Sequence, residues 1–245
     1  MPTPPTFEAR LLKARALSPS VRELGFERLD GEPMAFEPGQ WLNALTPVAK
    51  EPADMKRSYS IASPPDGSPG FDIAITRVHG GPVSTWFHAV DPGTLVQFTG
   101  PQGFFTRPPA SGAPALMIAT GTGVAPMRSM ILAAVAAGAR TPMSLLLGVR
   151  HEEDSLYADE FHKLAREHPF IRFEVTLSQP STSWQGRRGY VQAHVRELWS
   201  ALAAGNEENT HAYVCGLQRM IGSVRDLLRK DMGLARRQVH SERYD

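Results

Sequence analysis

The chain has 245 residues, 42% hydrophobic and 21% charged, so it can bury a substantial core and is not disordered throughout. Its 26 basic and 25 acidic side chains give a formal charge of +1, which argues against a nucleic-acid-binding protein. The single cysteine, Cys215, excludes an internal disulfide, a four-cysteine zinc site and a cysteine-ligated iron–sulfur cluster. Without a signal-like start or an apolar run of about 18 residues, we expect a cytoplasmic protein with no membrane insertion.

The first part of the chain is predicted to be an antiparallel barrel. Turn signals such as Asp30-Gly31 and Asp91-Pro92-Gly93 separate short segments that are rich in β-branched and aromatic residues. Only 84–90 has a helical pattern, so no long helix connects the strands and a six-stranded antiparallel barrel is favoured. The expected strands are Phe7–Leu17, Val21–Leu29, Gln40–Leu45, Arg57–Ser63, Phe71–Val78 and Thr94–Thr99.

A stretch rich in Pro, Gly, Ser and Ala at 107–114 predicts a boundary between a domain at 1–109 and a second at 110–245. Beyond it, apolar strands alternate with helical periods, which predicts a doubly wound parallel sheet with its ligand at the carboxyl ends of the strands. The expected strands are Ala115–Ala119, Met143–Val149, Ile171–Ser178, Ala212–Cys215 and Gln238–Arg243, and the expected helices are Pro126–Ala137, Ser155–Glu167, Val191–Ala203 and Leu217–Met232.

The strongest motif is a glycine turn, Thr120-Gly121-Thr122-Gly123-Val124-Ala125-Pro126, between an apolar strand and a helix. Such a turn directs backbone N–H groups and the helix dipole at one point, which suits a pyrophosphate, and the threonine hydroxyls add donors. The motif is neither Gly-x-Gly-x-x-Gly nor a nucleotide-triphosphate loop. Taken alone, an ordinary tight turn explains it equally well.

Two motifs in the barrel half also suit a dinucleotide. In Arg57-Ser58-Tyr59-Ser60, alternation along a strand places Arg57 and Tyr59 on one face, where an arginine fork meets phosphate and an aromatic ring stacks on a flat ligand. Gly80-Gly81-Pro82-Val83-Ser84 opens a short helix and forms a second candidate anion site, with Ser84 as a hydroxyl donor. Each motif alone is also compatible with an ordinary barrel strand or turn.

In chain order, Arg57-x-Tyr59-Ser60, Gly81-x-x-Ser84, the glycine turn, Cys215-Gly216 and Glu242-x-Tyr244 resemble the ferredoxin–NADP⁺ reductase family over essentially the whole chain. The resemblance implies that FAD is bound. Arg57 would bind its pyrophosphate, Tyr59 would pack against the isoalloxazine, and Ser60 would hydrogen-bond near flavin N5. The second FAD turn would be formed by Gly81, Val83 and Ser84.

For the pyridine nucleotide, the resemblance assigns the pyrophosphate to Thr120, Gly121, Thr122, Gly123 and Pro126. Cys215 and Gly216 would lie beside the reacting nicotinamide carbon. Glu242 would be the family's terminal acid, and Tyr244 would cover the flavin, so that Ser60, Cys215, Glu242 and Tyr244 form the catalytic group. In plant-type members the tyrosine is the last residue, whereas Asp245 follows it here and displaces the free carboxylate.

The choice between NADP and NAD depends on cations at the ribose 2′-phosphate. Arg150 and Arg187 match positions that contact this phosphate in bacterial members of the family, and Ser178 is a further candidate cofactor-binding residue. However, Gln179 stands where NADP-specific members usually carry arginine. The pattern favours NADP while leaving NAD open.

The resemblance implies a monomeric FAD-dependent oxidoreductase that moves hydride between NAD(P)H and flavin in the cleft between its domains. Single electrons would then pass to a separate carrier, ferredoxin or flavodoxin, received by arginines such as Arg77, Arg107 and Arg128. Two alternatives stay open: an NADH-preferring reductase component of an oxygenase system, and an electron-transfer subunit of a larger complex. A flavin-free short-chain dehydrogenase is disfavoured because no tyrosine has lysine four residues later. No metal site is expected, since His151-Glu152-Glu153-Asp154 is typical of a helix start.

Overall fold

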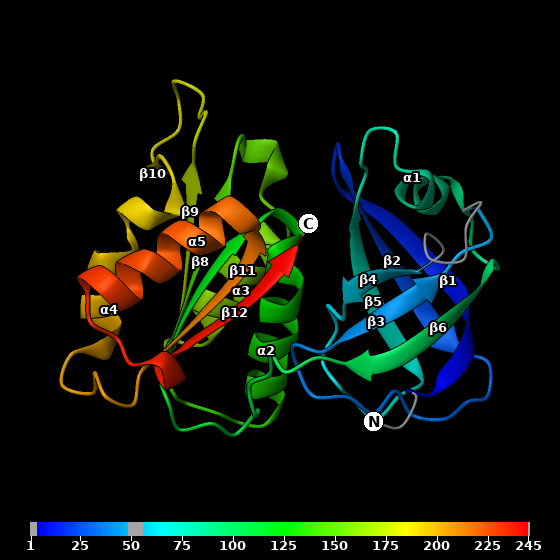
Figure 1. The fold of residues 1–245 in the computed structure, drawn as a ribbon, viewed down its shortest axis with the longest axis horizontal. Helices are drawn as coiled ribbons and strands as arrows, with labels where there is room; N and C mark the ends of the chain where they lie inside the picture. Colours follow the sequence, from blue (N-terminus) through cyan, green and yellow to red (C-terminus); the bar gives the residue numbers. More distant parts are fainter. Residues whose placement is uncertain (1–3, 49–55, 245) are drawn as a thin grey trace. The chain divides into compact units, whose positions relative to one another are not determined.

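The computed structural model describes residues 4–48 and 56–244, and its chain divides into two compact units (Figure 1). The first unit comprises Met1–Pro109 and Arg128–Ala137, and the second comprises Ala110–Met127 and Gly138–Asp245. Helix α2 (Val124–Ala136) therefore contributes its start to the second unit and its remainder to the first. The domain boundary expected at residue 110 stays a prediction.

The first unit is a six-stranded antiparallel sheet in the order β4-β3-β6-β1-β2-β5, as expected from its short strands and turns. An Ile61–Ile73 bridge and a bond from the Ala62 N–H to the Asp72 carbonyl join the two ends of this order, which closes the sheet into a barrel. Its elements are β1 (Thr6–Ser18), β2 (Val21–Arg28), β3 (Trp41–Leu45), β4 (Lys56–Ser60), β5 (Gly70–Thr76), α1 (Pro82–Ala89) and β6 (Leu95–Gln102).

Alternate residues of the barrel strands build its core. In β1, Phe7, Ala9 and Leu11 are buried while their neighbours are exposed, which is the period of two expected of a strand with one face inside. Four phenylalanine rings meet in the interior with centroid separations of 5.1–6.0 Å: Phe7, Phe26, Phe71 and Phe98. Burying each ring stabilises the folded state by about 1.5–3 kcal/mol relative to leaving the ring exposed. This core holds β4 and α1 in place.

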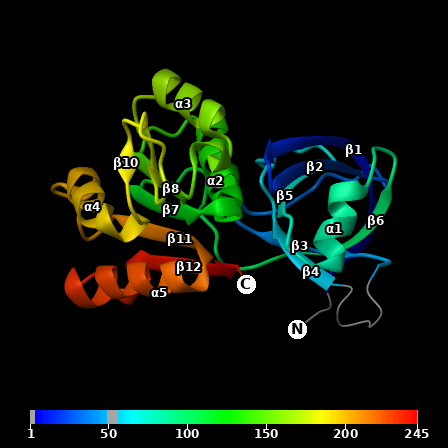
Figure 2. The same cartoon turned by 90° about the horizontal axis from the view of Figure 1, so that it is seen from above.

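The second unit is an entirely parallel sheet in the order β10-β9-β8-β7-β11-β12. All five residues from Ala115 to Ala119 are buried, as expected of a central strand covered on both faces. Figure 2 shows α4 and α5 on one face and α3 on the other. The elements are β7 (Ala115–Thr120), β8 (Met143–Val149), α3 (Ala158–Glu167), β9 (Ile171–Leu177), β10 (Arg187–Arg188), α4 (Val195–Ala203), β11 (His211–Leu217), α5 (Gln218–Asp226) and β12 (Val239–Tyr244).

Several details of the second unit differ from expectation. The helices expected from Ser155 and from Val191 begin at Ala158 and at Val195. The glycine turn coils as a 3-10 helix at Gly121–Gly123, so α2 begins at Val124, two residues before Pro126. The helix predicted to end at residue 232 is regular only to Asp226 and continues as a wider π turn at Leu227–Asp231. Strand β10 was not predicted, because two residues are too few to show a periodic pattern. Within residues 4–48 and 56–244, no helix is long and apolar enough to cross a membrane.

Candidate functional site

Three of the predicted groups meet at the carboxyl edge of the parallel sheet. β11 lies between β7 and β12, with Cys215 in register with Ala119 on one side and Glu242 on the other. Two residues further, Leu217 is in register with Tyr244, and β7 ends in the glycine turn. The turn, Cys215-Gly216 and the terminal strand therefore lie side by side, as the parallel topology requires.

The glycine turn packs against the end of β11 without room for side chains. A Cβ on Gly123 would collide with the Cys215 carbonyl, and a Cβ on Gly216 would collide with the Thr120 hydroxyl. The Leu217 N–H also donates to the Thr120 Oγ1 at 3.3 Å, which ties the turn to the strand. Both glycines are thus required by close backbone approach, and Gly216 additionally has a φ of +141°.

The opposite side of the turn is open. Gly121 has a φ of +52°, and a Cβ placed there would meet no atom within 4 Å. This space lies where a helix begins, and backbone N–H groups at such a start attract phosphate. The residues at this edge therefore fit the pyrophosphate of a pyridine nucleotide.

Cys215 is fully buried beside this turn. Burial raises the pKa of its thiol well above the usual value, and the nearby Glu242 carboxylate raises it further. Hydrogen bonds with the Tyr244 side chain and the Gly216 backbone act in the opposite direction but do not reverse the pKa shift. The thiol is therefore protonated at neutral pH, and it serves as a small neutral packing group and not as a nucleophile.

In the barrel, β4 places Arg57 and Tyr59 differently. The exposed Arg57 guanidinium donates to the Lys56 carbonyl at 2.8 Å, whereas the Tyr59 ring is half-buried and packs edge-on to Phe87 of α1 at 5.6 Å. Burial raises the pKa of the Tyr59 phenol, so the ring is neutral. The next residue, Ser60, is buried. The Tyr59–Phe87 contact holds the Arg57–Ser60 motif of β4 against α1, the helix that begins within the Gly81–Ser84 motif.

The start of α1 offers backbone donors. Gly81 is its N-cap and makes no side-chain cap, while Pro82 has no N–H, so the N–H groups of Val83 and Ser84 are not bound by a capping side chain. The Ser84 hydroxyl accepts from the Val78 N–H at 3.1 Å and donates to the Gly81 carbonyl at 3.2 Å, so it shapes the turn. With the exposed Arg57, this donor set fits the pyrophosphate of FAD.

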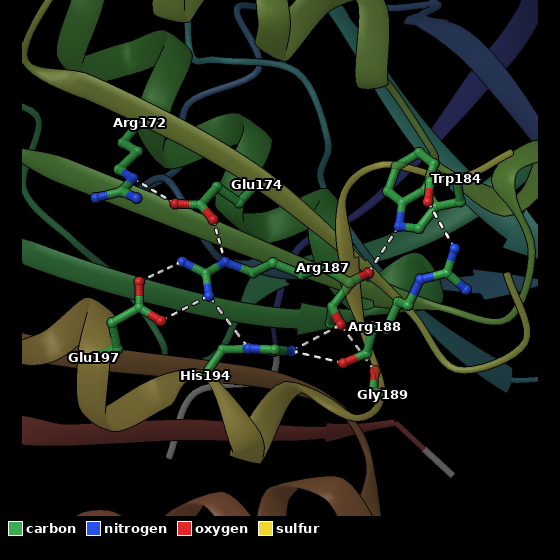
Figure 3. Close-up of polar contacts among 9 residues, drawn as sticks. Arg172, Glu174, Trp184, Arg187, Arg188, Gly189, His194 and Glu197 are labelled. Atoms are coloured by element: carbon green, nitrogen blue, oxygen red, sulfur yellow. Dashed lines mark hydrogen bonds and ion pairs between the residues drawn. The ribbon is translucent and has the colours of Figure 1, made fainter.

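The two candidates for the 2′-phosphate, Arg150 and Arg187, and the further cofactor-binding candidate Ser178 have different surroundings. Arg150 follows β8 and is exposed, and within the described residues its side chain forms no ion pair or hydrogen bond. The Ser178 N–H and hydroxyl both donate to the Val149 carbonyl, at 3.0 and 3.4 Å. Arg187 is bound by Glu174 and Glu197, as Figure 3 shows. Sequence reasoning also passed over its neighbour Arg188, which is exposed.

Two of the arginines expected to receive an electron carrier are buried, so this expectation is wrong for them. Arg107 is 2% exposed and Arg128 is 8% exposed. Arg128 donates to the Ala62 carbonyl at 2.9 Å and lies 3.8 Å from the Asp72 carboxylate. Arginines are usually exposed, and the sequence did not reveal the acidic and carbonyl partners that compensate this charge. Arg77 is exposed, as expected.

Comparisons with known proteins decide the family. Residues 8–106 match the model of the oxidoreductase FAD-binding domain, and residues 117–226 match that of the oxidoreductase NAD-binding domain. The chain is 53% identical to ferredoxin–NADP reductase B of Sorangium cellulosum over 240 residues, covering 98% of each chain. The chain belongs to the ferredoxin–NADP⁺ reductase family. It is an FAD-dependent oxidoreductase that uses a pyridine nucleotide, as its motifs predicted.

More distant relatives of this chain include components of oxygenase systems. The phenol hydroxylase P5 protein of Acinetobacter pittii is 27% identical, over 97% of this chain and 65% of its own. Among solved structures, the Amycolatopsis cytochrome P450 reductase GcoB superimposes with a TM-score of 0.84 at 27% identity, covering 99% of this chain and 71% of its own. This chain thus spans about two thirds of the length of these two proteins.

Proposed function

We propose that the protein transfers hydride between NADPH and bound FAD and passes electrons singly to a separate carrier protein, ferredoxin or flavodoxin. The observation that carries the proposal is the glycine turn packed against Cys215-Gly216 with its other side open. The 53% identity to a ferredoxin–NADP reductase supports it. FAD, when bound, supplies the ability to exchange a hydride with nicotinamide and single electrons with a carrier, which no side chain provides.

The chain's own residues bind FAD and the pyridine nucleotide and orient them. Arg57 and the N–H groups at the start of α1 hold the FAD pyrophosphate, while Tyr59 and the buried Ser60 line the flavin. The turn from Thr120 to Pro126 holds the nucleotide pyrophosphate. Cys215 and Gly216 are buried beside the proposed nicotinamide site and place no charge there, since the thiol is protonated and the glycine has no side chain. Glu242 and Tyr244 complete this edge on the adjoining strand.

NADP is the proposed nucleotide because the carboxyl edge carries an uncompensated cation. Arg150 is exposed and has no carboxylate partner within the described residues. A phosphate of charge about −2 would find there a charge-assisted donor that the hydroxyl of NAD does not need. Cytoplasmic location and a monomeric state stay predictions.

An NADH-preferring reductase of an oxygenase system is the second candidate. Two observations favour it: Arg187 is neutralised by carboxylates, and Gln179 occupies a position where an arginine is usual in NADP-specific members. The 27% identity to the phenol hydroxylase P5 protein also supports it.

Steady-state kinetics with both nucleotides separates the two candidates. The purified flavoprotein is assayed with NADPH and with NADH, first with ferricyanide and then with ferredoxin or flavodoxin as acceptor. The proposal predicts a higher kcat/KM for NADPH and reduction of at least one of the two carriers. A higher kcat/KM for NADH, with neither carrier reduced, would favour the oxygenase reductase.

A further inference from the structure

The two adjacent arginines of β10 have opposite electrostatic surroundings. Every nitrogen of the Arg187 guanidinium is hydrogen-bonded (Figure 3). Its Nη1 and Nη2 bind the two Glu197 oxygens at 2.8 and 2.7 Å, and its Nε donates to Glu174. Arg172 also pairs with Glu174, so the group of two arginines and two glutamates is neutral. A phosphate approaching Arg187 would have to displace a carboxylate.

The Arg187 side chain also extends away from the nucleotide edge. In the sheet, Arg187 is in register with Thr176, yet its guanidinium binds Glu174, which lies two residues earlier on β9. The side chain therefore runs toward the amino end of β9. Nucleotides bind in such folds at the carboxyl ends of the strands, which is the opposite direction.

The Arg187 network holds the backbone of its neighbour. Arg187 can only donate, so His194 accepts from it through Nδ1 at 3.2 Å and carries its proton on Nε2. That Nε2–H donates to the Arg188 carbonyl at 3.0 Å. The buried Thr176 hydroxyl donates to the Gly189 carbonyl at 2.9 Å, and the Trp184 indole donates to the Arg187 carbonyl at 2.8 Å. The three successive carbonyls of residues 187–189 therefore each accept a side-chain hydrogen bond, which fixes the backbone of β10 and of the residue after it.

Arg188 stands at the nucleotide edge with its charge uncompensated. It is in register with Leu177, the last residue of β9, and is exposed. Its Nη2 donates to the carbonyls of Trp184 at 2.7 Å and Ser181 at 3.3 Å. These bonds orient the guanidinium but leave its positive charge, and no carboxylate pairs with it in the described part of the chain.

Arg150 leaves the sheet at the same level. Val149 is in register with Leu177, so Arg150, directly after β8, and Arg188, at the end of β10, flank the end of β9. Two contacts hold the intervening loops together: His151 Nδ1 with the Gln179 carbonyl at 2.9 Å, and Ser181 with the Glu152 carboxylate. The loop after β8 carries three carboxylates: the Ser181 N–H and hydroxyl bind Glu152, the His151 N–H donates to Asp154 at 3.3 Å, and Glu153 is exposed, but none of them pairs with Arg150 or Arg188.

We propose that Arg188, together with Arg150, binds the ribose 2′-phosphate of NADP, whereas Arg187 is a positioning residue that fixes β10 and makes no contact with the phosphate. The proposal rests on the proposed use of NADP and names the residues that recognise it. It also corrects the choice that the resemblance made between the two adjacent arginines.

Binding of two adenosine ligands tests this assignment without turnover. 2′,5′-ADP and 5′-AMP differ only in the 2′-phosphate, so the ratio of their dissociation constants, measured by calorimetry, isolates its recognition. We expect R188Q and R150A each to lower the preference for 2′,5′-ADP about tenfold, the effect of losing one charge-assisted hydrogen bond. Glutamine is chosen at position 188 because its amide still donates to the Trp184 carbonyl.

Arg187 variants provide the matched comparison. R187A should weaken both ligands by a similar factor, leave their ratio within about twofold and lower the melting temperature of the ligand-free protein. R187K should behave like R187A, because lysine cannot bind two carboxylates and His194 at once. If residue 187 bound the 2′-phosphate, R187K would instead keep the wild-type preference for 2′,5′-ADP, since lysine binds phosphate well.

Two results would overturn the assignment: a fall in the 2′,5′-ADP preference with R187A but not with R188Q, or a wild-type protein that binds both ligands equally. Flavin content is recorded for every variant. Wild-type protein that binds 5′-AMP but takes up no FAD would contradict the proposed function and not the assignment of Arg188.

Discussion

The two units bring their candidate site residues together by different means. In the parallel sheet, β7, β11 and β12 run in one direction, so the residues at their carboxyl ends meet at one edge whatever their side chains are. In the antiparallel barrel, β4 and α1 meet through a packing contact, the Tyr59–Phe87 pair. The nucleotide half of the site therefore depends on backbone fit, and the flavin half depends on side-chain packing.

The largest effect is expected from removing the packing contact. Phe87 is fully buried and touches Tyr59 and Trp86, so Phe87→Ala should lower the free energy of unfolding by about 3–5 kcal/mol and release FAD more readily. Urea denaturation and flavin retention on gel filtration measure both. Phe104 is 97% exposed, and Phe104→Ala should change stability by less than about 0.5 kcal/mol. Unchanged FAD retention in Phe87→Ala would show that this contact does not position β4.

The next effect is on the flavin pyrophosphate. Arg57→Ala removes a charge-assisted hydrogen bond worth about 1.5–3 kcal/mol, so the dissociation constant of FAD should rise roughly tenfold to a hundredfold. Fluorescence titration of the deflavinated protein with FAD measures it. The adjacent Lys56→Ala is the control, because successive side chains point to opposite faces of a strand. Equal effects of the two substitutions would remove Arg57 from the site.

The close approach of the glycine turn to the end of β11 is tested by adding one methyl group to the turn. Gly123→Ala places a Cβ against the Cys215 carbonyl, which should cost about 1–3 kcal/mol of stability and weaken NADP⁺ binding. In α5, a Cβ on Gly222 meets nothing within 4 Å, so Gly222→Ala should stabilise the protein by about 0.5–1 kcal/mol. Thermal denaturation and nucleotide difference spectra measure both variants. Wild-type NADP⁺ affinity in Gly123→Ala would contradict the account of the turn.

A smaller effect is expected at the chain end. The Tyr244 side chain hydrogen-bonds Cys215 and lies where the proposed nicotinamide site begins, so ring and nicotinamide compete. Aromatic packing is worth about 0.5–1.5 kcal/mol, and Tyr244→Ser should tighten NADP⁺ and NAD⁺ binding by roughly twofold to tenfold. Phe104→Ser, at a ring of the first unit that is 97% exposed, should leave both affinities unchanged. Difference spectra that give wild-type affinities for Tyr244→Ser would remove the ring from the nicotinamide site.

The smallest effect is a pH dependence that is confined to the parallel sheet. Burial lowers the pKa of His240 below its usual 6.5, and the neighbouring His211 lowers it further. Near pH 6.5, His240 therefore binds a proton in the unfolded chain but not in the folded one. The free energy of unfolding should fall as the pH drops through this value. His240→Gln should flatten this slope in urea titrations between pH 7.5 and 5, whereas His162→Gln, at an exposed ring, should not. An unchanged slope in His240→Gln would exclude His240 as its source.

The same difference explains what the sequence allowed us to predict. The strands, the two sheet types and the meeting of the glycine turn with Cys215-Gly216 follow from periodicity and parallel topology. The burial of Arg107 and Arg128 did not, because the partners of Arg128 are remote in the sequence: Asp72 lies in β5 and Ala62 in the segment after β4. The contrast between Arg187 and Arg188 was also invisible, since it depends on Glu174 and Glu197 reaching one of two adjacent arginines.

The central claim is that the barrel holds FAD and that NADPH reduces it. The most direct measurement is the visible spectrum of the purified wild-type protein, supplied with FAD and then titrated anaerobically with NADPH. The account predicts a yellow protein with an equimolar amount of bound FAD, bleached by NADPH at lower concentrations than by NADH. A colourless protein that takes up no FAD would contradict it.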